Sequence, residues 1–215
     1  MDNLTAMVKK MAECIIENEI NFCKLDSYAG DGDFGMSVAK GFIEVRKEWH
    51  DIVSTKRTNI KEFLLSCAMI IMEHCGGASG PIWGSAFRAA ALSAGDKQTL
   101  TIPEFAAMMQ AAVKGIQATG ERSFGRGAVV GDKTLIDALV PCADVLSASA
   151  DETDVAAILK KGAAAARDGA EKTKQIVARM GRAGTVGERS LGYPDAGAYA
   201  LGVIFTEIAE YMQYE

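Results

Sequence analysis

The sequence has little of the chemistry that supports several common kinds of site. Its 215 residues include only two histidines, His50 and His74, which offer neither a metal cluster nor a catalytic triad. The five cysteines are odd in number and contain no CxxC pair. This usage favours reduced thiols in the core of a cytoplasmic protein over a disulfide framework.

Positive charge and long apolar runs are also scarce. The formal net charge is −5, and no run of consecutive lysines and arginines exceeds two residues. Such a chain has no general attraction for nucleic acid or for an anionic membrane surface. No stretch approaches the ~20 apolar residues of a membrane span. Acidic residues throughout the N-terminal segment argue against a signal peptide.

Helical periodicity is abundant. Leu4, Met7, Val8 and Met11 follow the i, i+3, i+4 spacing of an amphipathic helix, and no segment sustains the two-residue alternation of a half-buried strand. We therefore expect one all-α domain over residues 1–215, an up-and-down bundle or barrel of eight antiparallel helices. The expected helices cover about 3–22, 36–50, 60–74, 81–94, 101–119, 133–147, 154–180 and 198–214.

The loops between these helices fall into two groups. Glycine-rich or acidic loops follow the first, third, fifth and seventh helices, whereas the joins after the second, fourth and sixth resemble plain turns. Alternate loops of an up-and-down bundle lie at the same end. We therefore expect the four unusual loops to form a site at one rim.

The first of these loops, LDSYAGDGDFG, holds Asp26, Asp31 and Asp33 among glycines. Carboxylates this close repel one another unless a cation neutralises them. Magnesium prefers hard oxygen ligands, and glycines allow the backbone to bend so that the carboxylates converge. A metal site is one interpretation. The other is a solvated turn in which Asp33 caps the next helix.

The other three loops also leave alternatives open. GGASGP, residues 76–81, places small residues at a helix N-terminus, where free N–H groups can meet an anion, but taken alone the motif favours tight packing of two helix ends. In the third loop, Asp132 could cap the sixth helix. In the fourth, Arg182 and Arg189 could balance phosphate charge, or one of them could pair with Glu188.

In this order, LDSYAGDGDFG, GGASGP, GDKTLIDAL and GRAGTVGERSLGYPDAGA resemble the ADP-binding L subunit of dihydroxyacetone kinase and the matching domain of its single-chain relatives. The resemblance covers essentially the whole chain. It implies a barrel of eight antiparallel helices with the nucleotide at one rim. It also implies a phosphotransferase that acts on an alcohol group, with no catalytic side chain of its own.

The resemblance further implies a cofactor site for ADP or ATP with two Mg²⁺ ions held by Asp26, Asp31 and Asp33. Phe34 stands where the family usually has histidine, and Tyr193-Pro194 stands where it often has His-Gln. The residues that the resemblance places beside the nucleotide are Phe34, Gly35, Met36, Ser37, Ala78, Ser79, Gly120, Leu135, Arg182, Asp195, Ala196 and Gly197.

As partner, the resemblance implies a K subunit that binds dihydroxyacetone or a related small ketose. In one version of the family a phosphotransferase M subunit rephosphorylates bound ADP, and in the other ATP exchanges. The sequence leaves open which version applies and whether the chain forms a homodimer. Two other functions remain as alternatives: a non-catalytic nucleotide-sensing module of the same fold, and a carrier for an apolar ligand inside the barrel.

Overall fold

The computed structural model describes residues 2–54 and 59–213, and within these ranges it contains helices and no strands. In chain order the α-helices are α1 (Asp2–Glu17), α2 (Glu19–Asp26), α3 (Phe34–Lys47), α4 (Trp49–Val53), α5 (Ile60–His74), α6 (Ser79–Ala94), α7 (Ile102–Phe124), α8 (Ile136–Ala148), α9 (Val155–Lys172) and α10 (Ala196–Tyr211). Short 3-10 helices lie between α9 and α10: η1 (Thr173–Gln175), η2 (Ala183–Thr185) and η3 (Gly187–Ser190).

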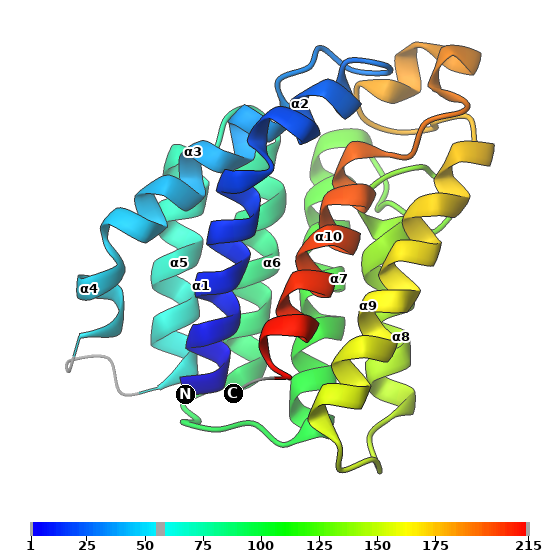
Figure 1. Ribbon diagram of the computed structural model, residues 1–215. Coiled ribbons are helices and arrows are strands. Elements are labelled where there is room, and N and C mark those ends of the chain that lie inside the picture. The colour runs from blue at the N-terminus through cyan, green and yellow to red at the C-terminus, as the bar shows by residue number, and fades with distance from the viewer. Residues whose placement is uncertain (1, 55–58, 214–215) are drawn as a thin grey trace.

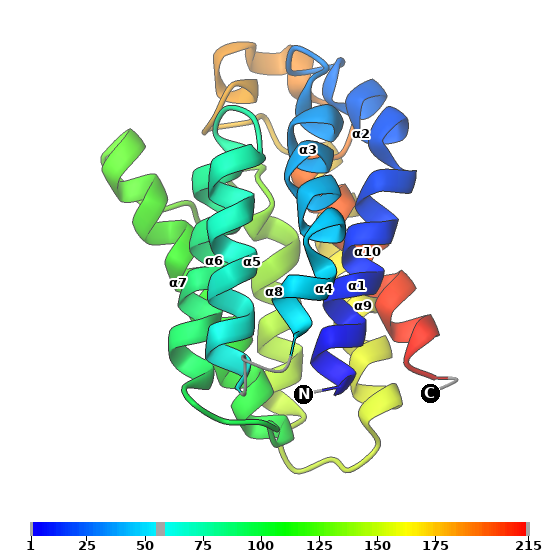
Figure 2. The same ribbon diagram turned by 90° about the vertical axis from the view of Figure 1, so that its left-hand side faces the viewer.

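The long helices stand side by side in a closed ring (Figures 1 and 2). Around the ring, α1 packs against α3, then α5, α6, α7, α8, α9 and α10 follow in turn, and α10 packs against α1. One residue, Asn18, separates α2 from α1, and one residue, Glu48, separates α4 from α3. If α1 and α2 are counted as one interrupted helix, and α3 and α4 as another, the ten α-helices of the described residues form eight antiparallel units. This confirms the expected all-α barrel of eight antiparallel helices.

Several helix ends differ from the expected ones. Helix α7 runs through Gly120 and ends at Gly125, whose φ of 76° is the left-handed conformation typical of a glycine after a helix. Helix α8 begins at Ile136 instead of residue 133 because Lys133 has a φ of 61° and cannot be helical.

Helix α9 ends at Lys172 instead of residue 180, because the chain turns there through η1. The last expected helix, about 198–214, begins two residues earlier, at Ala196, and ends at Tyr211; residue 214 lies outside the described part of the chain.

Local side chains cap the starts of α5 and α7. Asn59 accepts a hydrogen bond from the N–H of Glu62 at the start of α5. At the start of α7, Thr101 and Glu104 exchange hydrogen bonds in a capping box. Each cap satisfies backbone groups that the first helical turn leaves without a partner.

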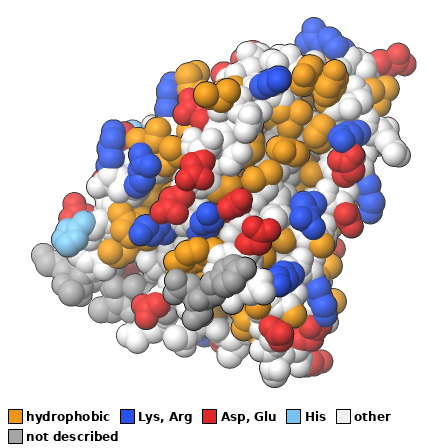
Figure 3. All heavy atoms as spheres, in the orientation of Figure 1, with side chains coloured by type: hydrophobic (Ala, Val, Ile, Leu, Met, Phe, Trp, Pro, Cys, Tyr) orange, Lys and Arg blue, Asp and Glu red, His pale blue; other side chains and the backbone are white. Residues whose placement is uncertain are grey.

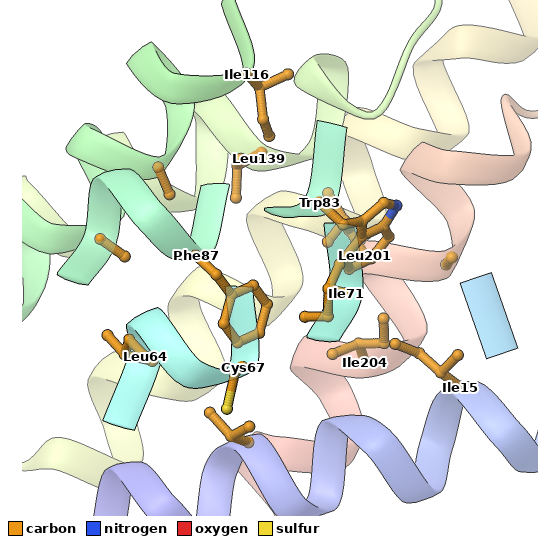
Figure 4. Close-up of a cluster of buried hydrophobic side chains, with 14 of the residues drawn as sticks. Ile15, Leu64, Cys67, Ile71, Trp83, Phe87, Ile116, Leu139, Leu201 and Ile204 are labelled. Carbon is orange, nitrogen blue, oxygen red and sulfur yellow. The ribbon is translucent and has the colours of Figure 1, made fainter. Parts of the chain in front are cut away.

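Apolar side chains from α1, α5, α6, α7, α8 and α10 point into the ring (Figure 4). They do not fill it completely. An apolar cavity of about 130 Å³ remains, lined by side chains that include Leu64, Trp83 and Phe87. On the face that Figure 3 shows, acidic and basic side chains are interspersed, and no extended basic patch is visible. None of the helices in the described ranges is both long and apolar enough to cross a bilayer.

Helices α8 and α9 approach so closely at Gly169 that only glycine fits. A Cβ there would overlap the carbonyl oxygen of Asp137. Gly→Ala inside a helix ordinarily stabilises by about 1 kcal/mol. For Gly169→Ala we instead expect a loss of about 1–3 kcal/mol in the free energy of unfolding, since the two helices must separate.

Urea denaturation measures this difference. Asp168→Ala, at the exposed neighbouring position of the same helix, is the control and should be neutral or slightly stabilising. A Gly169→Ala variant as stable as the wild-type protein would show that the two helices do not approach this closely.

Candidate functional site

The four glycine-rich and acidic loops lie together at one end of the barrel, at the top of Figure 1. Hydrogen bonds tie them to one another. The N–H of Gly76 donates to the carbonyl of Ser37 at 3.0 Å, which joins the second loop to the start of α3. The N–H of Arg179 donates to the carbonyl of Asp132 at 3.0 Å, which joins the fourth loop to the third. The expected rim is therefore present.

The carboxylates of Asp26, Asp31 and Asp33 converge at this rim. One oxygen from each lies within 4.8 Å of the other two, which suits ligands of a shared cation. The backbone enforces this arrangement. The N–H of Gly32 donates to Asp26 Oδ2 at 2.8 Å. A Cβ on Gly30 would overlap the Asp26 carboxylate, so a larger residue there would displace that carboxylate.

The clustered charges perturb one another. Burial and the negative charges of Asp31 and Asp26 raise the pKa of Asp33, while the positive charge of Arg182 opposes the shift. Arg182 Nη1 lies 2.5 Å from Asp31 Oδ2 and so neutralises part of the negative charge. A divalent cation at the same place would do so more completely. The donor set of carboxylate oxygens fits magnesium or another hard cation.

Two helices point their N-termini toward the cluster without side-chain caps among the described residues. Asp33 precedes α3, and Ala78 precedes α6, yet neither residue caps its helix through its own side chain. In the first turn of α3, the N–H of Met36 donates to Cys23 Sγ at 3.2 Å. N–H groups in the first turn of a helix can bind an anion, and the helix dipole favours negative charge there. In α6 the N–H of Ser79 already donates to the carbonyl of Gly76 at 3.1 Å, and Pro81 has no N–H. The rim thus combines a cation site with anion-binding helix ends, which is the combination that a metal-bound phosphate requires.

The residues expected at the start of α3 occupy different environments. Phe34 packs against the core, with its ring centroid 6.2 Å from that of Phe22, so it faces inward. Gly35 is pressed against α2, where a Cβ would overlap the carbonyl of Glu19. Ser37 is buried beside Gly76, whereas Met36 is exposed at the rim. In α6, Ala78 is exposed and Ser79 is half-buried.

The third and fourth loops meet at Leu135. A Cβ on Gly197 would lie 3.1 Å from the Cβ of Leu135, so the turn Asp195-Ala196-Gly197 packs directly on that residue. Asp195 caps α10 by accepting a hydrogen bond from the N–H of Ala198 at 2.8 Å. Gly120 lies in α7 beside residues 126–128. The assignment of the twelve nucleotide-contacting positions stays a prediction.

Three of the open alternatives are answered by hydrogen bonds and ion pairs. Asp33 does not cap α3 with its side chain. Asp132 does not cap α8; its carboxylate pairs with Arg126 and accepts from the N–H of Val129. Arg182 pairs with Asp31 and not with Glu188. Asp132 and Arg182 thus form ion pairs, with Arg126 and Asp31, in place of the simpler roles that the sequence left open.

No sequence pattern pointed to Lys133 or to a pair of tyrosines at this rim. The Lys133 side chain is buried, with the residue only 2% exposed, and Nζ donates to the carbonyls of Thr173 at 2.6 Å and Tyr193 at 2.7 Å. The rings of Tyr28 and Tyr193 stack in parallel, 3.7 Å apart. Pairs so distant in sequence carry no local pattern by which they could be found.

Comparison with known proteins assigns the chain to a family. Residues 28–210 match the DAK2 domain, and the chain belongs to this family. It is 33% identical over 212 residues to L-erythrulose 1-kinase of Mycolicibacterium smegmatis, covering 98% of this chain and 35% of that protein.

A shorter relative is similar over most of its own length. The chain is 32% identical over 197 residues to the PEP-dependent dihydroxyacetone kinase 2, ADP-binding subunit DhaL, of Listeria innocua, covering 91% of this chain and 88% of that subunit. The resemblance to the L subunit is therefore confirmed.

A solved structure shares the fold. The dihydroxyacetone kinase from C. freundii in complex with AMP-PNP and Mg²⁺ superposes with a TM-score of 0.70 at 26% identity, covering 96% of this chain and 33% of that one. The chain spans about a third of the length of this kinase and of L-erythrulose 1-kinase.

Asp195 provides a test of the electrostatics at this rim. Burial raises the pKa of its carboxyl to about 7, although the hydrogen bond from Ala198 lowers it. In the unfolded chain it titrates near 4. The folded state therefore binds more protons between about pH 4 and pH 7, and stability falls as pH rises through that window.

Asp195→Asn keeps an oxygen acceptor for the cap and removes this titration. We expect the metal-free variant to gain stability relative to the wild-type protein from pH 4 to pH 7, by a few kcal/mol at most, since one pKa unit is worth about 1.4 kcal/mol. Thermal denaturation across pH measures the gain, with exposed Asp168→Asn as control. A pH-independent difference would contradict the assigned shift.

Proposed function

We propose that this chain is a single nucleotide-binding domain that carries Mg-ADP or Mg-ATP and donates a phosphoryl group to a small ketose held by a partner subunit. The convergence of Asp26, Asp31 and Asp33 carries the proposal, because three carboxylates within 4.8 Å of one another call for a cation. The uncapped starts of α3 and α6 beside them offer N–H groups for the phosphates.

In this proposal the three aspartates hold two Mg²⁺ ions, which when bound neutralise phosphate charge. The chain's own groups position the donor. Ala78 and Ser79 meet phosphate at the start of α6, and Arg182 supplies a forked cation from the fourth loop. Leu135 and Gly120 border the base, and Phe34, Gly35, Met36, Ser37, Asp195, Ala196 and Gly197 complete the nucleotide contacts.

Phosphoryl transfer needs positioning and electrostatic stabilisation more than covalent help from the protein. No catalytic side chain is therefore proposed in this chain. The acceptor hydroxyl comes from the partner, a K subunit that presents dihydroxyacetone or a related ketose at the rim. The names of the relatives, an L-erythrulose 1-kinase and an ADP-binding subunit of dihydroxyacetone kinase, support this acceptor class.

Removal of one aspartate tests the metal site. Asp31→Ala should weaken Mg²⁺-dependent ADP binding by about 100-fold or more, because one of three clustered ligands is gone. Isothermal titration calorimetry with and without Mg²⁺ measures the loss, with Asp168→Ala as control. Unchanged ADP affinity in the Asp31 variant would refute the metal assignment.

A kinase assay separates the proposed enzyme from a nucleotide-sensing module of the same fold. The chain and its cognate K subunit are incubated with dihydroxyacetone or with erythrulose and a phosphoryl donor, which is either ATP or, with ADP present, a phosphorylated phosphotransferase M subunit. We expect phosphorylated ketose only when all components and Mg²⁺ are present. Tight Mg-ADP binding without any transfer would instead favour the sensing module.

The apolar cavity favours a second, compatible function as carrier of an apolar ligand. Its lining is almost entirely aliphatic and aromatic, and a dry cavity of this size binds apolar molecules more readily than water. Such a role would leave the aspartates unexplained, so it does not replace the first proposal. Organic extraction of the purified chain followed by mass spectrometry tests it, and an extract free of lipid would count against a carrier.

A further inference from the structure

The chain between α9 and α10 forms a cap beside the aspartate loop. We call residues 174–193 the cap segment. In both ribbon views it lies next to the loop that follows α2 (Figures 1 and 2). It contains η2 and η3, and it carries Arg182, which reaches Asp31. A nucleotide bound to the aspartates would lie against this segment.

Hydrogen bonds join the two ends of the cap segment at its base. The N–H of Gly192 donates to the carbonyl of Lys174 at 2.9 Å, and the N–H of Asp195 donates to Thr173 Oγ1 at 2.8 Å. Lys133 reaches the base from the third loop and bonds the carbonyls of Thr173 and Tyr193. Because this ammonium is buried, breaking both bonds would leave its charge without these partners inside the protein.

Two further contacts hold the cap segment to the aspartate loop, and they differ in kind. The ion pair between Arg182 and Asp31 depends on a carboxylate that a metal ion would also use. A bound cation competes with the guanidinium for Asp31, so this contact weakens when the site is loaded. The stack of Tyr28 on Tyr193 involves no metal ligand and no charge.

Tyr193 connects the base to the aspartate loop. Its carbonyl accepts from the buried Lys133, while its ring covers one face of Tyr28, three residues before Asp31. The two rings remain partly exposed, Tyr28 to 37% and Tyr193 to 42%, so the stack lies at the surface where the cap segment must lift. Through Tyr193, the stack is connected to the buried Lys133.

We propose that the stack of Tyr28 and Tyr193 fastens the cap segment over the phosphate site and sets the rate at which bound nucleotide leaves; this inference rests on the proposed function. Tyr193 is thus a positioning residue. The stack slows the dissociation of bound nucleotide and does not affect the initial binding step, because it forms only when the cap segment covers the site. Loss of the stack should change dissociation much more than association.

Stopped-flow fluorescence tests this with the full chain, Mg²⁺ and the fluorescent analogue N-methylanthraniloyl-ADP, displaced by excess ADP. Tyr193→Leu should raise the dissociation rate about three- to tenfold, the range expected for an aromatic pair, and leave the association rate within about twofold. Tyr193→Phe keeps the ring and should behave as the wild-type protein. Tyr28→Leu should match Tyr193→Leu, and the double variant should add little, because both changes remove one interaction.

Tyr199→Leu is the matched control, since Tyr199 is equally exposed at 42% but packs edge-on against Phe22. It should leave the dissociation rate unchanged. Equal rates in the wild-type, Tyr193→Leu and Tyr28→Leu proteins would overturn the inference while leaving the proposed function intact. A wild-type chain that does not bind the analogue would overturn both.

Limited trypsin digestion without nucleotide gives a second readout that does not need the proposed function. Arg179, Arg182 and Arg189 lie in the cap segment and become cleavable when it lifts. Tyr193→Leu should speed cleavage at these sites by a similar factor, and Tyr193→Phe should not. Equal cleavage in the two variants would show that the stack does not hold the cap segment.

Discussion

The packing of α1 against α10 closes the ring of helices, and the position of the site depends on that contact. The ion pair between Lys10 and Glu207, 2.9 Å long, spans the same junction. In an open row of helices the loop after α2 and the loop before α10 would lie at opposite edges. Closure brings them together, and α2 itself then packs against α10. The aspartates therefore share a rim with the segment that carries Arg182.

The rim brings carboxyl groups closer together than their charges favour. Asp26, Asp31 and Asp33 repel one another, and Asp195 adds a further carboxylate whose protonated form is favoured near neutral pH. Such an arrangement costs stability, and the fold offsets it with glycines, backbone donors and one guanidinium. Proteins maintain costly electrostatics of this kind where a ligand will compensate for them.

The sequence was sufficient to predict the arrangement of the helices and the end at which the site lies, but not every helix boundary. Two features were enough to predict eight antiparallel helices and a common rim. One is the helical spacing of residues such as Leu4 and Met7, and the other is the alternation of plain and glycine-rich loops. Both signals are local or depend only on order along the chain. The end of α9 and the start of α8 were misplaced, because Lys133 and Thr173 take their conformations from each other across 40 residues.

The same limit applies to the stacked tyrosines. Nothing near Tyr28 in sequence indicates that its ring will meet Tyr193, since each is an ordinary aromatic residue in a polar loop. The aspartates, in contrast, were conspicuous because three carboxylates within eight positions have few structural uses. Functional residues that are close together in the sequence can thus be recognised from the sequence alone. Contacts between distant loops are seen only in the folded structure.

The unfilled interior also has a mechanical consequence. An apolar pocket of about 130 Å³ that water does not fill adds to the volume of the folded protein, and unfolding eliminates it. Hydrostatic pressure favours the state of smaller volume, so compression works against this barrel more strongly than against a fully packed helical bundle. An apolar ligand bound in the pocket would reduce this sensitivity to pressure, because its atoms would fill the empty space.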